Sequence, residues 1–240
     1  MDNQGQNSVR EAIILAGGFG TRLQPAVSDL PKPMAPVAGR PFLEYLLDHL
    51  IRQKITNVVL SVGYKAKIII EHFRDSYNGL SIKYCVEEAP LGTGGAIRQS
   101  LKMVSQKDVI VLNGDSFFDI DYDQLLSAHR EKKADITIAF KPMKNFDRYG
   151  SVTLEKSRIV TFEEKKARSS GFINGGVYVI RRDLFNGVLS LPRKFSFEQD
   201  FLMRFVHDYM IAGHLCDGYF VDVGTPNDYN SAQNELAKYS

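Results

Sequence analysis

The sequence contains no tryptophan and only two cysteines among its 240 residues. Cys85 and Cys216 lie far apart and form no Cys-x-x-Cys pair, which excludes a disulfide-rich scaffold. Cys85 falls within a strand-like run, so we expect it to be a buried free thiol, consistent with a reducing compartment.

Long apolar runs and an excess of one charge are also missing. The longest apolar stretches, such as residues 13–16, are far too short to span a bilayer, and the polar N-terminus does not resemble a signal peptide. The 30 basic and 28 acidic side chains give a net charge of +2, without the basic excess typical of proteins that bind nucleic acid or membrane surfaces. We therefore expect a cytoplasmic protein that binds neither, as a monomer or a homodimer.

Short apolar segments alternate with amphipathic ones in the first half of the chain. The strand-like segments are residues 12–16, 58–62, 82–86 and 109–112, and the helical segments are 41–53, 65–76 and 94–104. This alternation predicts a parallel sheet covered by helices.

The second half is less regular. Its strand-like segments are 136–140, 151–154, 159–162, 177–180 and 219–221, with helices near 198–210 and 227–238. They predict an antiparallel or mixed extension of the same sheet. Because no linker or repeat separates the halves, we expect a tail over residues 1–10 and a single domain over 11–240.

A glycine-rich turn follows the first predicted strand. Gly17, Gly18 and Gly20 allow backbone N–H groups to approach an anion closely, and Arg22 can bind phosphate oxygens in a bidentate way. The segment lacks the Gly-Lys-Ser/Thr of a P-loop, and Leu23 replaces the third glycine of a dinucleotide fingerprint. By itself it fits an ordinary tight turn equally well.

Three further charged residues lie in positions suited to phosphate chemistry. Pro31 and Pro33 restrict the backbone on both sides of Lys32. Asp115 and Asp222 each follow a predicted strand, and ligands of open α/β sheets bind beyond the carboxyl ends of strands. The two aspartates could share one Mg²⁺, although either could instead cap a turn.

Taken together, these motifs resemble the sugar-phosphate nucleotidyltransferase family. Gly17–Leu23 with Pro31–Pro33 resembles its signature, and its later motifs follow in order at Asn113–Asp115, Glu164–Lys165, Asn174–Gly176 and Asp222–Thr225. The resemblance implies a Rossmann-like three-layer α/β/α fold with a mostly parallel, mixed central sheet and a small sugar-binding lobe. It also implies the joining of a nucleoside triphosphate to a sugar 1-phosphate with release of pyrophosphate.

The resemblance further implies a role for each motif residue. The nucleotide would contact Leu15, Gly17, Gly18, Gly20, Thr21, Glu87, Gly92 and Thr93. The sugar 1-phosphate would contact Asn113, Gly150, Glu164, Lys165 and Asn174. Arg22 and Lys32 would act in catalysis by neutralising the triphosphate, and Asp115 and Asp222 would bind the Mg²⁺ cofactor.

The proposed chemistry requires no general base, because the nucleophilic phosphate oxygen is already an anion. Electrostatic stabilisation and in-line positioning should supply most of the acceleration. This agrees with motifs that contain Arg, Lys and Asp without a Ser-His-Asp arrangement. The five histidines show no metal-ligand spacing.

Glu87 is the residue most informative about the nucleotide. In the family, the position three before the proline of this loop faces the base, and relatives that take thymine or uracil tend to have glutamine there. A carboxylate only accepts hydrogen bonds, which suits the two adjacent donors of guanine, N1–H and the exocyclic amine. We therefore expect GTP. The alternative is that Glu87 points to solvent and backbone atoms read the base.

For the sugar, residues 91–97 and 112–119 resemble the branch of the family that acts on D-glycero-α-D-manno-heptose 1-phosphate. Mannose 1-phosphate guanylyltransferases are the nearest competitors, since both sugars share the manno ring. The resemblance implies a GDP-heptose for bacterial surface polysaccharide, and residues 196–200 are expected on the sugar side or as a helix cap.

Two alternative functions remain, one without catalysis and one from another class of enzyme. One is a catalytically inactive regulator that senses a sugar nucleotide, against which the intact Arg22, Lys32, Asp115 and Asp222 argue. The other is a Rossmann dehydrogenase. It is disfavoured by the missing third glycine and by the absence of an acidic residue after the second strand, at Ser61–Gly63.

Overall fold

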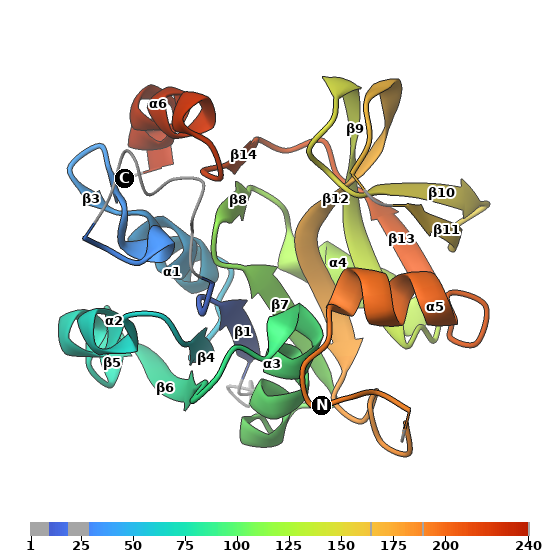
Figure 1. Ribbon diagram of the computed structural model, residues 1–240, viewed down its shortest axis with the longest axis horizontal. Helices are drawn as coiled ribbons and strands as arrows, with labels where there is room; N and C mark the ends of the chain where they lie inside the picture. The colour runs from blue at the N-terminus through green and yellow to red at the C-terminus, as the bar shows by residue number, and fades with distance from the viewer. Residues whose placement is uncertain (1–9, 19–28, 164, 189, 240) are drawn as a thin grey trace, which may run out of the picture.

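A ten-stranded mixed sheet runs through the structure, which is a computed structural model describing residues 10–18, 29–163, 165–188 and 190–239 (Figure 1). Its strand order is β10-β11-β13-β9-β12-β7-β1-β4-β6-β5. Two short pairs, β8 with β14 and β2 with β3, lie outside it.

The elements alternate along the first half of the chain, as predicted. The strands are β1 Glu11–Leu15, β2 Pro36–Val37, β3 Arg40–Pro41, β4 Asn57–Val62, β5 Ser76–Tyr77, β6 Leu80–Val86, β7 Asp108–Asn113, β8 Ser116–Phe118, β9 Ile136–Phe146, β10 Ser151–Glu155, β11 Arg158–Glu163, β12 Arg168–Arg181, β13 Ile211–Leu215 and β14 Phe220–Asp222. The α-helices are α1 Phe42–Arg52, α2 Ala66–Phe73, α3 Gly92–Ser100, α4 Tyr122–Glu131, α5 Met203–Phe205 and α6 Pro226–Glu235. Shorter helical turns cover Lys32–Met34, Leu101–Met103, Phe197–Leu202 (a π-helix) and Leu236–Tyr239. None of the helices in the described ranges is long and apolar enough to cross a bilayer.

Strands β7, β1, β4 and β6 are parallel, and apolar side chains cover both of their faces. In β1, Ala12 and Ile14 pack in a core with helices α1, α2 and α4, whereas Ile13 packs on the opposite face with α3. This alternation follows from the two-residue period of a strand. Cys85 is a buried free thiol in the second core, as predicted. The predicted three-layer α/β/α fold with a mixed sheet is therefore confirmed.

The second half extends the sheet and then closes on itself. Strand β12 pairs antiparallel with β7 and so joins the halves. Beyond it, β12, β9, β13, β11 and β10 form a ring, because β10 pairs with both β11 and β12. Closure gives each of these five strands a partner on both sides over part of its length. The ring forms the second lobe, at the upper right of Figure 1.

Helix α4, strand β13 and the short strands β2, β3, β5 and β8 were not predicted from the sequence. Helix α4 begins at Asp121, whose carboxylate accepts a hydrogen bond from the Gln124 N–H. It buries Tyr122, Leu125, Leu126 and His129. Strand β13 was also missed, because its Ala-Gly-His centre has low strand propensity and it is held in place by parallel pairing with β9.

A buried carboxylate ties the start of the sheet to the turn before β7. Glu11 lies at the beginning of β1, and its Oε2 accepts hydrogen bonds from the Ser105 hydroxyl at 3.0 Å and the Gln106 N–H at 2.7 Å. The Ser105 N–H donates to the same oxygen. Charge-assisted bonds of this kind are stronger than neutral ones, and each contributes about 1.5–3 kcal/mol.

We predict that Glu11→Gln lowers the free energy of unfolding by about 1–3 kcal/mol, because the amide removes the charge that these donors share. Urea unfolding followed by circular dichroism measures the change. Glu71→Gln is the control, since that side chain is 65% exposed on α2 and should change stability by less than about 0.5 kcal/mol. Equal unfolding midpoints for the two variants would contradict the assigned role of Glu11.

Candidate active site

A cavity of about 800 Å³ opens beyond the carboxyl ends of β1, β6 and β7, between the parallel sheet and the ring. The predicted site residues that line it are Leu15, Gly17, Gly18, Lys32, Glu87, Gly92, Thr93, Asn113, Asp115, Gly150, Lys165, Asn174 and Asp222. The others, Gly20, Thr21, Arg22 and Glu164, lie outside the described residues. The structure thus brings together every predicted site residue that it describes, and their individual roles stay predictions.

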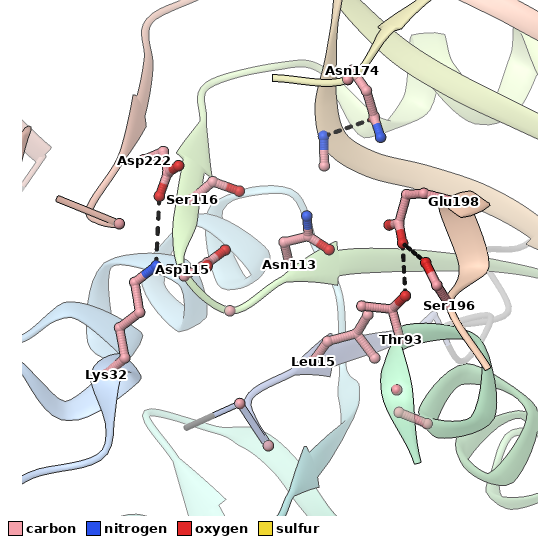
Figure 2. A pocket seen from close by; sticks show the side chains of 18 of the residues that line it. Leu15, Lys32, Thr93, Asn113, Asp115, Ser116, Asn174, Ser196, Glu198 and Asp222 are labelled. Carbon is pink, nitrogen blue, oxygen red and sulfur yellow. Dashed lines mark hydrogen bonds and ion pairs between the residues drawn. The ribbon is translucent and has the colours of Figure 1, made fainter. Parts of the chain in front are cut away.

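Lys32 lies between the two aspartates at one end of the cavity (Figure 2). Its Nζ is 2.6 Å from Asp115 Oδ2 and 3.6 Å from Asp222 Oδ1, and its side chain is only 8% exposed. The restricted backbone predicted for this lysine takes the form of a short helical turn that begins after Pro31. A buried ammonium beside two carboxylates holds a fixed positive charge where anionic substrates would enter.

Pairing of two short strands brings the aspartates together. Strand β8 follows Asp115, β14 ends at Asp222, and the two strands run antiparallel with Ser116 opposite Asp222. The Val223 N–H also donates to the Asp115 carbonyl at 3.0 Å. Neither contact was visible in the sequence, because the two aspartates are separated by most of the second half of the chain.

The electrostatics at Asp222 favour a bound cation. Burial, followed by the negative charge of Asp115, raises the pKa of the Asp222 carboxyl, and Lys32 offsets this only in part. Asp222 Oδ1 is buried and has no hydrogen-bond partner among the described residues. A divalent cation would reduce the repulsion and bind this oxygen, which otherwise has only the ion pair with Lys32 at 3.6 Å among the described residues. Across the part of the chain that the structure describes, no group of three or more His, Cys, Asp or Glu side chains could hold a metal, so substrate or water oxygens would complete its coordination.

A hydrogen-bond network crosses the opposite wall of the cavity (Figure 2). Asn174 Nδ2 donates to the Tyr178 hydroxyl at 2.6 Å, which donates to Glu198 Oε1 at 3.2 Å. Glu198 Oε2 accepts from Thr93 Oγ1 at 2.7 Å and from Ser196 Oγ at 3.1 Å. The network therefore connects a residue predicted to bind the sugar with one predicted to bind the nucleotide.

Glu198 and Tyr178 were not among the predicted site residues. Glu198 lines the cavity from a π-helix, an irregular turn that is frequent at functional sites. The only sequence signal was the Ser196–Asp200 segment, which was expected on the sugar side or as a helix cap. The helix cap is confirmed, since Ser196 Oγ accepts from the Gln199 N–H, whereas the place of this segment on the sugar side stays a prediction.

Arg148 also lines the cavity, although the sequence did not single it out. Its guanidinium forms a bidentate pair with Asp228 in α6 and also donates to Thr225 Oγ1 at 3.1 Å. It thereby connects the ring lobe with the segment that follows Asp222. Next to it, burial and the charge of Asp222 raise the pKa of Tyr149 to about 12.

The Glu87 side chain lies against the glycine turn at the other end of the cavity. Its Oε1 accepts from Ser61 Oγ at 3.1 Å, and its Oε2 accepts from the Leu91 N–H at 3.0 Å. A Cβ at Gly17 would come within 2.5 Å of Oε1, so a larger residue there would have to displace the Glu87 carboxylate. The carboxylate is therefore held by the protein and does not extend into solvent.

Known proteins resemble this chain over most of its length. It is 47% identical to D-glycero-alpha-D-manno-heptose 1-phosphate guanylyltransferase of Aneurinibacillus thermoaerophilus over 229 residues. This alignment covers 95% of this chain and 99% of that protein. It is 36% identical to mannose-1-phosphate guanylyltransferase of Mycobacterium tuberculosis, over 95% of this chain and 65% of that protein. The solved structure of HddC from Yersinia pseudotuberculosis complexed with GMP-PN has a TM-score of 0.85 and 33% identity, over 95% of this chain and all of that one.

The family model described as nucleotidyl transferase matches residues 11–239. This range contains β1 with its glycine turn, the Lys32 and aspartate cluster, and the residues of the opposite cavity wall. With the cavity geometry and the similar proteins, the match shows that the chain belongs to the nucleotidyl transferase family.

Proposed function

We propose that this protein transfers a guanylyl group from GTP to D-glycero-α-D-manno-heptose 1-phosphate, giving GDP-heptose and pyrophosphate. The observation that carries the proposal is 47% identity to an enzyme of that name over almost the full length of both chains. It is supported by the single cavity that collects all of the described residues predicted to act. Because GTP is a cytoplasmic metabolite, we place the reaction in the cytoplasm, where its product would supply surface polysaccharide synthesis.

The charged end of the cavity would bind the triphosphate. Two carboxylates and one ammonium leave it net negative, so it suits a Mg²⁺ ion, whose preferred ligands are oxygens. Asp115 and Asp222 would hold that ion, and Asp222 Oδ1, which accepts no hydrogen bond from the described residues, would be one of its ligands. When bound, Mg²⁺ would neutralise phosphate charge and stabilise the crowded α-phosphorus. Lys32 would place a second positive charge beside the same phosphates.

The opposite wall would bind the sugar 1-phosphate. Asn113 lines the cavity and would form a hydrogen bond with a sugar hydroxyl. Asn174 is oriented by its bonds to Tyr178 and the Gly176 N–H. Lys165 also lines the cavity and would supply positive charge for the sugar phosphate. These groups would fix the angle of in-line attack, since the phosphate nucleophile needs no base.

A pyrophosphate-release assay tests the function. It combines GTP, UTP, dTTP or CTP with the 1-phosphates of the heptose, mannose or glucose, with and without Mg²⁺. Release with GTP and the heptose supports the proposal. Release only with GTP and mannose 1-phosphate would correct the sugar. Tight GTP binding without release in any combination would favour the sensing regulator instead.

Replacing a metal ligand should remove turnover while the fold persists. We predict that Asp115→Asn lowers kcat by at least about 100-fold, because the Mg²⁺ ion loses a charged ligand, and that EDTA abolishes wild-type activity. Asp123→Asn is the matched control, as that carboxylate is 56% exposed on α4 and outside the cavity lining. Turnover of Asp115→Asn within a few-fold of the control would overturn the metal assignment.

Replacing the Glu87 carboxylate, which is predicted to contact the nucleotide base, should change the preferred nucleotide. We predict that Glu87→Gln raises the KM for GTP about tenfold or more and improves the use of UTP or dTTP, because an amide offers one donor and one acceptor. The measurement is kcat/KM for each nucleotide at saturating sugar 1-phosphate. An unchanged order of preference would show that Glu87 does not read the base.

A further inference from the structure

Ser61 contacts Glu87 from inside the protein. It lies in β4 and is fully buried, so a nucleotide in the cavity cannot touch it. Strand β4 lies between β1 and β6, as Figure 1 shows, and Glu87 follows directly after β6. The Ser61 hydroxyl therefore reaches the cavity only through its hydrogen bond to Glu87 Oε1, at 3.1 Å.

The protein uses half of the hydrogen-bonding capacity of the Glu87 carboxylate. An ionised carboxylate offers about four lone-pair positions, two on each oxygen. Ser61 Oγ occupies one position on Oε1, and the Leu91 N–H occupies one on Oε2. No other donor among the described residues bonds to this carboxylate, so one acceptor position on each oxygen would be left for a ligand. Two adjacent acceptors match the two adjacent donors of guanine, N1–H and the 2-amino group.

Neighbouring backbone contacts restrict the carboxylate further. The Ala16 N–H donates to the Ser61 carbonyl at 2.7 Å, and the Glu87 N–H donates to the Val62 carbonyl at 2.8 Å. Gly17 lies against Oε1 from the side of the glycine turn. The glycine turn after β1, the end of β4 and the start of the loop after β6 therefore meet around the Glu87 side chain and restrict its orientation. The Ser61 hydroxyl holds the Oε1 atom of that side chain.

We propose that Ser61 is a positioning residue for nucleotide specificity: its hydroxyl orients Glu87 so that both carboxylate oxygens face a guanine base. This inference rests on the proposed use of GTP. Ser61 itself contacts no substrate. Without its hydroxyl, the carboxylate can rotate about its terminal torsion, and the two acceptors no longer lie in the plane of the base edge. Affinity and discrimination then fall together.

The experiment compares GTP with ITP, which has the same base edge without the 2-amino group. Initial rates at saturating sugar 1-phosphate give kcat/KM for both nucleotides. We expect wild type to prefer GTP by about 10- to 100-fold, because ITP leaves one carboxylate acceptor unpaired. In Ser61→Ala, we expect the KM for GTP to rise about tenfold and the GTP-to-ITP ratio to approach one.

Two further variants separate positioning from a loss of packing. Ser61→Cys keeps the shape of the side chain with a somewhat larger atom that is only a weak donor, so it should lose discrimination while its thermal unfolding stays closer to wild type than that of a cavity-forming variant. Ser100→Ala removes another fully buried hydroxyl, in α3 and outside the cavity lining, and should keep the wild-type ratio.

The outcomes distinguish the two proposals. A wild-type protein that prefers UTP, dTTP or CTP would overturn the proposed use of GTP. Suppose instead that the wild-type protein prefers GTP over UTP, dTTP and CTP but uses ITP as efficiently as GTP. This result would overturn the proposal that Glu87 recognises the 2-amino group. If wild type discriminates and both Ser61 variants discriminate equally well, the positioning role of Ser61 is wrong, whereas the proposed enzyme stands.

Discussion

The contact of Lys32 with Asp115 and Asp222 is the interaction around which the cavity is organised. The two carboxylates repel each other, and burial followed by the charge of Asp115 raises the pKa of Asp222. The β8–β14 pairing keeps them together despite it. The protein therefore carries local electrostatic stress at the place where a cation and phosphates would bind, and ligand binding would relieve it.

The remaining cavity walls are held by hydrogen bonds between segments distant in sequence. Glu198 receives donors from Thr93, Ser196 and Tyr178, and Arg148 links the ring lobe to α6. Such networks fix polar side chains before a ligand arrives, so less conformational freedom is lost on binding. Closure of the five-stranded ring supports this arrangement, because β12 carries Asn174 and is paired on both sides there.

The parallel half of the fold could be predicted because its signals are local. A buried parallel strand is a short apolar run, and an amphipathic helix shows its period within a dozen residues. Helix α4 carried the same signal at Leu125, Leu126 and His129 and was missed, whereas β13 carried little signal of its own. Ring closure through β10 and β12 depends on pairing between segments, and the residues give no local indication of it.

The sequence by itself determined the elements of the parallel sheet, the glycine turn and the identity of the charged side chains, since these follow from residue type and short spacing. It also determined family membership, through motifs that occur in order along the chain. Tertiary structure alone decided which groups meet. Ser61 reaches Glu87, Thr93 reaches Glu198, and Asp115 lies beside Asp222, because strand register and crossover connections place them together. Hydrogen bonds and charge interactions act over a few ångströms in space, and separation along the chain does not reveal them.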